Sequence, residues 1–91
     1  MYMDGDKRMR YTTINTILNE AGFSCRKEAF AEYWSIGDIN FCIKTKKDGS
    51  IILINIADGD WGYIKYVKNI RCSQVSVFIT WKTGEEWYLR Y

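Results

Sequence analysis

The chain has 91 residues, 47% of them hydrophobic and 26% charged, with a formal net charge of +2 at pH 7. This composition is typical of a single globular domain with one core, and it excludes a disordered tail. The longest unbroken apolar run, from Ile51 to Ile54, is far too short to cross a membrane, so no membrane partner is expected. The three cysteines are odd in number and widely spaced, which is typical of reduced thiols and predicts a cytoplasmic location.

The amino-terminal third, residues 12–36, is predicted to be helical, after a lead-in at residues 1–10 that has no apolar period and is expected to be flexible. The apolar residues of a first helix recur at helical spacing, at Ile14, Ile17, Leu18 and Ala21. Thr12 or Thr13 can cap its start. Gly22 stands where a residue with positive φ commonly ends a helix.

A second helix is predicted from Ser24, a favourable amino-terminal cap, to Ile36, with Gly37 as its end. Cys25, Ala29, Tyr33 and Ile36 lie along one stripe of this helix. One longer helix interrupted at Gly22 is the alternative. Either arrangement can cover one face of a sheet.

Residues 38–91 are predicted to form an antiparallel β-meander of four or five strands, which makes the fold α+β, in one domain covering residues 1–91. Asp48-Gly49 tolerates the positive φ angles of a two-residue hairpin turn. This register places six apolar residues on one face, namely Ile39, Phe41, Ile43, Ile52, Ile54 and Ile56. A slip by one residue would move one strand's set to the other face.

The last hairpin offers two registers. A two-residue loop at Thr83-Gly84 would group apolar residues with Tyr88 and Arg90. A three-residue loop instead places Gly84 in the left-handed position of a bulged turn. This second register is the predicted one, because it keeps the apolar residues together: Val75, Val77, Ile79, Trp87 and Leu89.

If consecutive strands lie side by side, with one strand from Trp61 to Lys68, charges separate between the two ends of the sheet. The basic end would hold Lys44, Lys46, Lys47, Lys68, Arg71 and Arg90. The acidic end would hold Asp38, Asp58, Asp60, Glu85 and Glu86. Opposite local potentials steer partners even when the net charge is small.

No metal site, cofactor site or catalytic arrangement is predicted. The chain has no histidine, and its cysteines lack the paired spacing of a zinc site. Asp58-Gly59-Asp60 lacks the further ligands of a calcium loop and is predicted to be a turn. No nucleophile-and-base pair is visible, so the protein is expected not to be an enzyme. The one enzyme class retained is a small toxin-type ribonuclease, with candidate residues Lys65, Tyr66, Lys68 and Arg71.

The segment Ala21-Gly22-Phe23-Ser24-Cys25-Arg26-Lys27-Glu28-Ala29 resembles the helix-loop-helix of S4-type RNA-binding domains. In that family, basic side chains of this motif face RNA. The resemblance implies that Arg26 and Lys27 contact RNA.

Aromatic residues make up 16% of the chain, more than a sheet with two short helices is expected to bury. Some of them are therefore expected on the surface, where Tyr and Trp are favoured in binding hot spots or stack on unpaired bases. In size and composition the chain resembles small phage or mobile-element proteins. Among these are anti-CRISPR inhibitors, which occupy the nucleic-acid-binding surface of a host complex.

The predicted function is therefore that of a non-enzymatic inhibitor, a nucleic-acid mimic that docks its acidic end on a protein or nucleoprotein complex. Its predicted contact residues are Asp58, Asp60, Trp61, Tyr63, Tyr66, Glu85, Glu86 and Tyr88. The alternative is direct RNA or DNA binding through Arg26, Lys27, Lys44, Lys46, Lys47, Lys68 and Arg71. Homodimerisation through an edge strand is also expected, because the chain has no proline to protect an edge.

Overall fold

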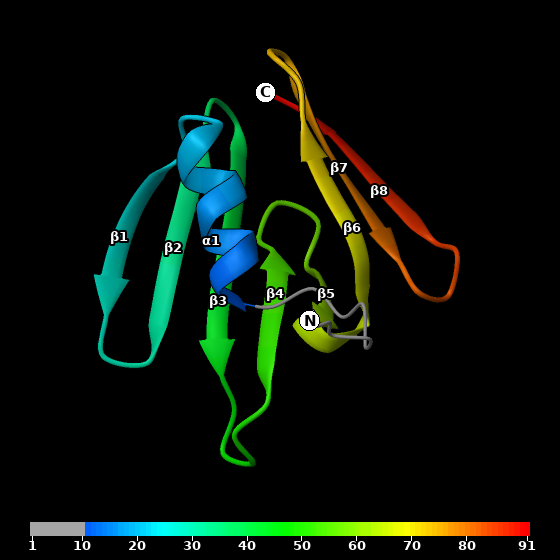
Figure 1. The fold of residues 1–91 in the computed structure, drawn as a ribbon. Helices are drawn as coiled ribbons and strands as arrows, with labels where there is room; N and C mark the ends of the chain where they lie inside the picture. Colours follow the sequence, from blue (N-terminus) through cyan, green and yellow to red (C-terminus); the bar gives the residue numbers. More distant parts are fainter. Residues whose placement is uncertain (1–10) are drawn as a thin grey trace, which may run out of the picture.

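The computed structural model describes residues 11–91, so the lead-in predicted at residues 1–10 lies outside the described part of the chain. Within that part, one α-helix precedes eight strands in two antiparallel sheets (Figure 1). The elements are α1 (Tyr11–Glu20), β1 (Ser24–Glu28), β2 (Ala31–Ile36), β3 (Ile39–Thr45), β4 (Ile51–Asn55), β5 (Asp60–Tyr63), the 3-10 helix η1 (Ile64–Tyr66), β6 (Val67–Cys72), β7 (Ser76–Trp81) and β8 (Glu86–Arg90). The first sheet has the order β1-β2-β3-β4-β5 and the second β6-β7-β8. The predicted α+β class is confirmed.

Helix α1 follows the predicted apolar spacing, and it buries Ile14 and Leu18 completely. Its end is also as predicted: Gly22 has a φ of +99°, and the amide of Phe23 donates to the carbonyl oxygen of Leu18 at 3.1 Å. The helix begins at Tyr11. The prediction that Thr12 or Thr13 caps it is therefore wrong, because both residues lie inside the first turn. No helix in residues 11–91 is long and apolar enough to cross a membrane.

The second predicted helix is wrong, because residues 24–36 form the β1–β2 hairpin. Strand β2 pairs with β3 along its whole length, and this pairing places Trp34 opposite Phe41 in the core. A helix here would bury only the side chains of one stripe. As a strand, this segment hydrogen-bonds its backbone to β3 and buries Trp34 to 5% exposure. The S4-type helix-loop-helix is therefore absent, and Arg26 and Lys27 lie on a strand.

The β3–β4 hairpin contains a three-residue loop, so the predicted two-residue loop is wrong. The amide of Gly49 donates to the carbonyl oxygen of Lys46 at 2.9 Å, and Gly49 has a φ of +85°. The amide of Lys46 donates a hydrogen bond to the carbonyl oxygen of Ser50 at 2.8 Å, as in a bulged turn. The register therefore pairs Ile43 with Leu53.

This register moves the β4 side chains by one position. Leu53 points toward α1 and is fully buried. Ile52 and Ile54 instead share the opposite face with Cys42, since Ile54 pairs directly with Cys42. Ile56 follows β4 and is 46% exposed. The predicted common face of six apolar residues therefore holds for the three on β3 but not for those that follow the turn.

The predicted register of the last hairpin is confirmed. Ile79 pairs with Trp87 and Val77 with Leu89, and Gly84 has a φ of +97° in a three-residue loop. Val75, which was expected on the same face, precedes β7 and is 53% exposed.

The single strand predicted from Trp61 to Lys68 is in fact β5, η1 and β6. This extra strand reverses the direction of everything that follows, so the predicted separation of charges is wrong. In Figure 1 the β3 and β7 arrows point down, toward the turns that carry Lys46 and Glu85, while the β4 and β6 arrows point up, toward Asp58 and Arg71. Basic and acidic residues therefore occur at both ends.

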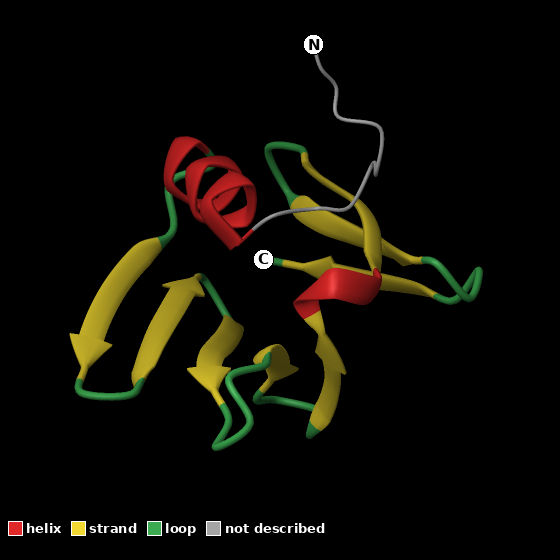
Figure 2. Ribbon diagram, turned by 60° about the horizontal axis from the view of Figure 1, so that its bottom comes forward, coloured by secondary structure: helices red, strands yellow, loops and turns green. Residues whose placement is uncertain are grey.

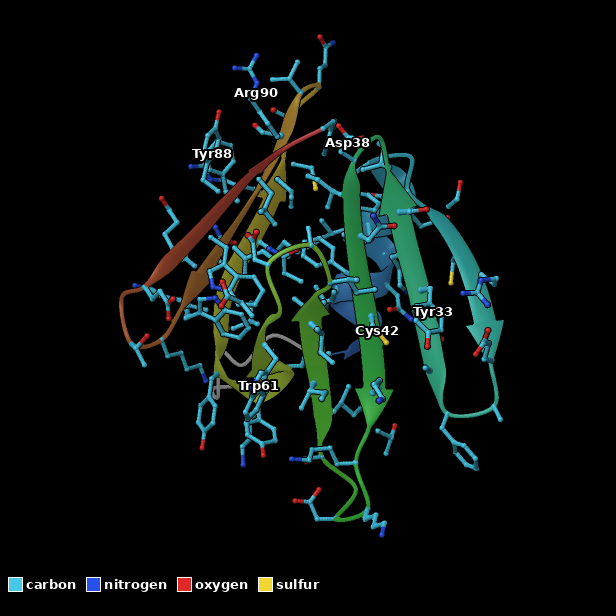
Figure 3. The ribbon with its side chains drawn as sticks, turned by 180° about the vertical axis from the view of Figure 1, so that it is seen from behind. Tyr33, Asp38, Cys42, Trp61, Tyr88 and Arg90 are labelled. Carbon is cyan, nitrogen blue, oxygen red and sulfur yellow. The ribbon has the colours of Figure 1, made fainter. Side chains whose placement is uncertain are left out.

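The two sheets share one core. Figure 2 shows α1 lying over one face of the five-stranded sheet, with the second sheet beside it, connected through η1. The buried cluster draws on α1 and on both sheets, with Ile14, Leu18, Phe41, Leu53, Val67, Val77, Ile79, Trp81 and Trp87 among its members. No element among residues 11–91 covers the face of the five-stranded sheet that points away from α1 (Figure 3).

Candidate functional site

The uncovered face of the five-stranded sheet carries a row of side chains that crosses all five strands. Strand pairing aligns this row as Arg26, Tyr33, Cys42, Ile54 and Trp61, from β1 to β5. Figure 3 shows Tyr33, Cys42 and Trp61 on the side opposite α1. With neighbouring strands about 4.8 Å apart, the row is roughly 19 Å long. We call this surface the outer face.

The next row of the outer face joins Glu28, Ala31, Lys44, Ile52 and Tyr63. Glu28 is the single carboxylate among the strand residues of this face in the described part of the chain, and it forms an ion pair with Arg26. Lys44, Lys46 and Lys65 have no such ion pair there. The outer face is therefore positive in potential at its β3–β5 side.

Cations and aromatic rings alternate on this face. The Arg26 guanidinium lies 4.5 Å from the centre of the Tyr33 ring. Lys46 Nζ lies 5.5 Å from the Trp61 ring and 5.6 Å from the Tyr63 ring. Lys65 Nζ lies 5.8 Å from Tyr63. Such contacts keep the two lysines beside ring faces without neutralising them, while Arg26 is also paired with Glu28.

Trp61, Tyr63 and Tyr66 form an aromatic group at the β5 edge. Trp61 and Tyr63 meet edge to face at 5.3 Å between ring centres, and Tyr63 meets Tyr66 at 6.2 Å. Trp61 is 53% exposed and Tyr66 49%. Trp61 and Tyr66 are therefore accessible to a partner while their contacts with Tyr63 hold them in place.

The two titratable groups at the middle of the outer face, Cys42 and Tyr33, are uncharged at neutral pH. Burial raises the pKa of the Cys42 thiol above its ordinary value of 9.0. The charged form of Cys42, followed by Glu28, raises the pKa of Tyr33 above 10.0. Both groups are therefore neutral at pH 7, and the surface charge is set by Arg26, Glu28 and the lysines.

Three of the predicted contact residues, Asp58, Glu86 and Tyr88, do not line the cavity described below. Asp58 accepts a hydrogen bond from Asn55 Nδ2 at 3.0 Å and so holds the β4–β5 turn. Glu86 accepts one from Thr80 Oγ1 at 3.2 Å on the second sheet, where Tyr88 packs on Phe78.

The remaining predicted contact residues line one cavity of about 290 Å³. They are Asp60, Trp61, Tyr63, Tyr66 and Glu85. The cavity lies between the β5 edge and the β7–β8 hairpin, because residues of both contribute to its wall.

The residues predicted to contact nucleic acid are also divided between the two sheets. Arg26 and Lys44 lie on the outer face, with Lys46 and Lys47 in the turn below it. Lys27 alternates with Arg26, so it points to the other side of β1. Lys68 and Arg71 belong to the second sheet, where the Arg71 guanidinium lies 4.2 Å from the Phe78 ring.

The prediction missed Tyr33, because this residue was placed in the second helix. The signal that could have found it is alternation: Arg26 and Tyr33 face the same way only if the chain turns at residues 29–30. The ribonuclease candidates are spread over η1 and β6, with Lys65 Nζ 5.1 Å from the Tyr66 ring and Arg71 over Phe78. No group of three or more metal-ligating side chains occurs in residues 11–91.

Comparison of the chain with protein-family models, with curated proteins and with solved structures found no match. Function is therefore argued from the site and its chemistry.

Proposed function

We propose that the protein binds single-stranded nucleic acid on the outer face of its five-stranded sheet. The observation that carries this proposal is the interleaving of four basic side chains with four partly exposed rings on one uncovered surface. The basic residues are Arg26, Lys44, Lys46 and Lys65, and the rings are Tyr33, Trp61, Tyr63 and Tyr66.

Binding would use both parts of this arrangement. Bases stack on the exposed rings, which is worth about 1–3 kcal/mol per base and tolerates any sequence. The lysines that now lie beside ring faces move to the phosphates as a base takes their place. Four phosphate contacts would give a salt dependence with a slope of roughly −3, at about −0.7 per phosphate.

The docking inhibitor predicted from the sequence relied on an acidic pole, and the mixed charges at both ends remove that support. A duplex is also a poorer fit than a single strand. Its bases are already stacked and offer no free faces to the rings.

The test is fluorescence anisotropy with a labelled 12-nucleotide single strand of mixed sequence and its duplex, over a range of salt concentrations. The double variant Lys44→Glu/Lys46→Glu is expected to weaken single-strand binding at least about tenfold. Its matched control is Lys68→Glu/Arg71→Glu, which makes the same charge change on the second sheet.

Absence of binding at low salt would refute the proposal. Equal losses in the two double variants would also refute it, because such a result describes diffuse attraction by net charge. Trp61→Ala tests the stacking separately, since it removes a ring without changing charge.

A further inference from the structure

The cavity beside the outer face is built by two tryptophans and one glycine. Trp81 and Trp87 form its floor, with exposures of 5% and 8% and ring centres 4.8 Å apart. Gly62 lets the Trp81 ring approach the β5 backbone, because a Cβ at this position would lie 2.5 Å from Trp81 Cη2. The rings of Trp61 and Tyr66 stand at the rim.

The cavity is about 290 Å³ in volume, near the lower end of the range typical of small-ligand pockets. A flat aromatic group is the natural occupant of a site lined by five aromatic side chains. The cavity also shares Trp61, Tyr63 and Tyr66 with the outer face, so a strand bound there passes its mouth.

Polar residues accompany these rings in the lining, namely Asp60, Thr83 and Glu85. The carboxylates of Asp60 and Glu85 lie in the wall as hydrogen-bond acceptors. Trp81, whose side chain lines the cavity, also carries a buried donor: its Nε1 is shielded from water and has no acceptor among residues 11–91. A buried donor without an acceptor has a free-energy cost that an entering acceptor would remove.

We propose that this cavity binds one unstacked guanine of the single strand, with a carboxylate accepting from the base and Trp81 donating to it. The inference rests on the proposed function. Guanine presents two neighbouring N–H donors, N1–H and N2–H, which match the two oxygens of a carboxylate, and a flanking O6 acceptor, which matches the indole N–H.

The other bases fit this set less well. Adenine and cytosine each offer one exocyclic amine flanked by an acceptor, and uracil offers one donor between two acceptors, so each would leave a carboxylate oxygen opposite an acceptor. A lysine or arginine side chain from a protein would satisfy the carboxylates and the rings, but it brings no acceptor for Trp81 Nε1.

Entry of a base requires movement at the rim, because Trp81 Nε1 is shielded from water. Trp61 and Tyr66, each about half exposed, are the rim side chains with room to turn aside. Guanine binding should therefore change tryptophan fluorescence as well as affinity.

The experiment compares labelled RNA nonamers that differ only at the central position, U4GU4, U4AU4, U4CU4 and U9, binding to the full chain. Wild-type protein is expected to bind U4GU4 at least about tenfold more tightly than the others, since one bidentate base contact discriminates roughly 5- to 150-fold. The variant Asp60→Asn/Glu85→Gln should lose this preference while keeping salt-dependent binding of U9. The control Asp38→Asn/Glu86→Gln makes the same charge change outside the cavity and should keep the preference.

Equal affinity of the wild type for all four nonamers would overturn the guanine site and leave single-strand binding intact. No binding of any nonamer would overturn both proposals. Capture of an arginine-rich peptide by the wild type but not by Asp60→Asn/Glu85→Gln, without discrimination among nonamers, would overturn the guanine site in favour of a cationic protein side chain.

Discussion

Replacing Gly62 with alanine tests the contact that joins the two sheets. An added Cβ would lie 2.5 Å from Trp81 Cη2 and 2.7 Å from Cζ3, about 1 Å inside the normal separation of roughly 3.5–4.0 Å between carbon atoms. Trp81 cannot simply swing away, because it is 5% exposed and packs on Trp87 at 4.8 Å.

The magnitude follows from two opposing effects. Overpacking of a filled core costs about 1–3 kcal/mol. Gly62 does not have positive φ, so alanine adds no backbone strain and gains about 0.4–1 kcal/mol by restricting the unfolded chain. The net expectation is a loss of about 1–2 kcal/mol in the free energy of unfolding, or a decrease in Tm of roughly 4–16 °C for a chain of this size.

Urea unfolding followed by circular dichroism measures this loss in the free energy of unfolding. A double-mutant cycle shows whether the loss comes from the contact with Trp81. Trp81→Leu removes the ring atoms that the new Cβ would meet, so Gly62→Ala in that background should be neutral or slightly stabilising. A Gly62→Ala protein as stable as the wild type, or a loss that persists with Trp81→Leu, would refute the reasoning.

Three further outcomes are expected. Burial, with a smaller contribution from Cys72, raises the pKa of Tyr91 to about 12 from its ordinary value of 10.0. Between pH 10 and 12 the folded protein therefore keeps the hydroxyl proton that the unfolded chain loses. The stability that Tyr91 adds relative to Tyr91→Phe should therefore be fully present below pH 10 and decrease as the pH rises toward 12. Urea titrations of both proteins over this pH range measure it, and a difference that stays constant would contradict the expectation. Gly49→Ala should cost about 1–2 kcal/mol, because Gly49 has a φ of +85° with no atom within 4 Å of an added Cβ, and Gly49→Asn should cost less in the same assay. Iodoacetamide followed by mass spectrometry should modify exposed Cys25 before buried Cys42, and simultaneous modification would show that the sheet opens.

Local patterns were sufficient where one element decides its own structure. Ile14 and Leu18 at helical spacing before Gly22 predicted α1. The last hairpin was predictable because one of its two registers gathers the apolar side chains and the other scatters them. The same turn geometry occurs at Lys47–Gly49, but Asp-Gly also suits a two-residue turn, and the isoleucine-rich β4 gives an apolar face in either register. Its true register could not be read from the pattern.

The candidate site was only partly predictable for the same reason. The aromatic residues Trp61, Tyr63 and Tyr66 were predicted as surface residues from the aromatic content of the chain, and the structure leaves Trp61 and Tyr66 exposed. Lys44 and Lys46 were predicted from the expected charge separation, and Arg26 from the resemblance to S4-type domains. Their neighbours were not, because Tyr33 reaches the outer face only through the β1–β2 hairpin, which long-range pairing with β3 stabilises. The cavity needed Gly62 to admit the Trp81 ring from another sheet.

By itself, then, the sequence determined the class of fold, helix α1, the last hairpin and an excess of exposed aromatic residues. Periodicity and turn glycines act over a few residues, so they require no knowledge of distant partners. Only the tertiary structure decided that residues 24–36 are strands, that β5 and β6 are separate, and which charges share an end. These features depend on burial against residues far along the chain, and that burial outweighs local preferences of a few tenths of a kcal/mol per residue.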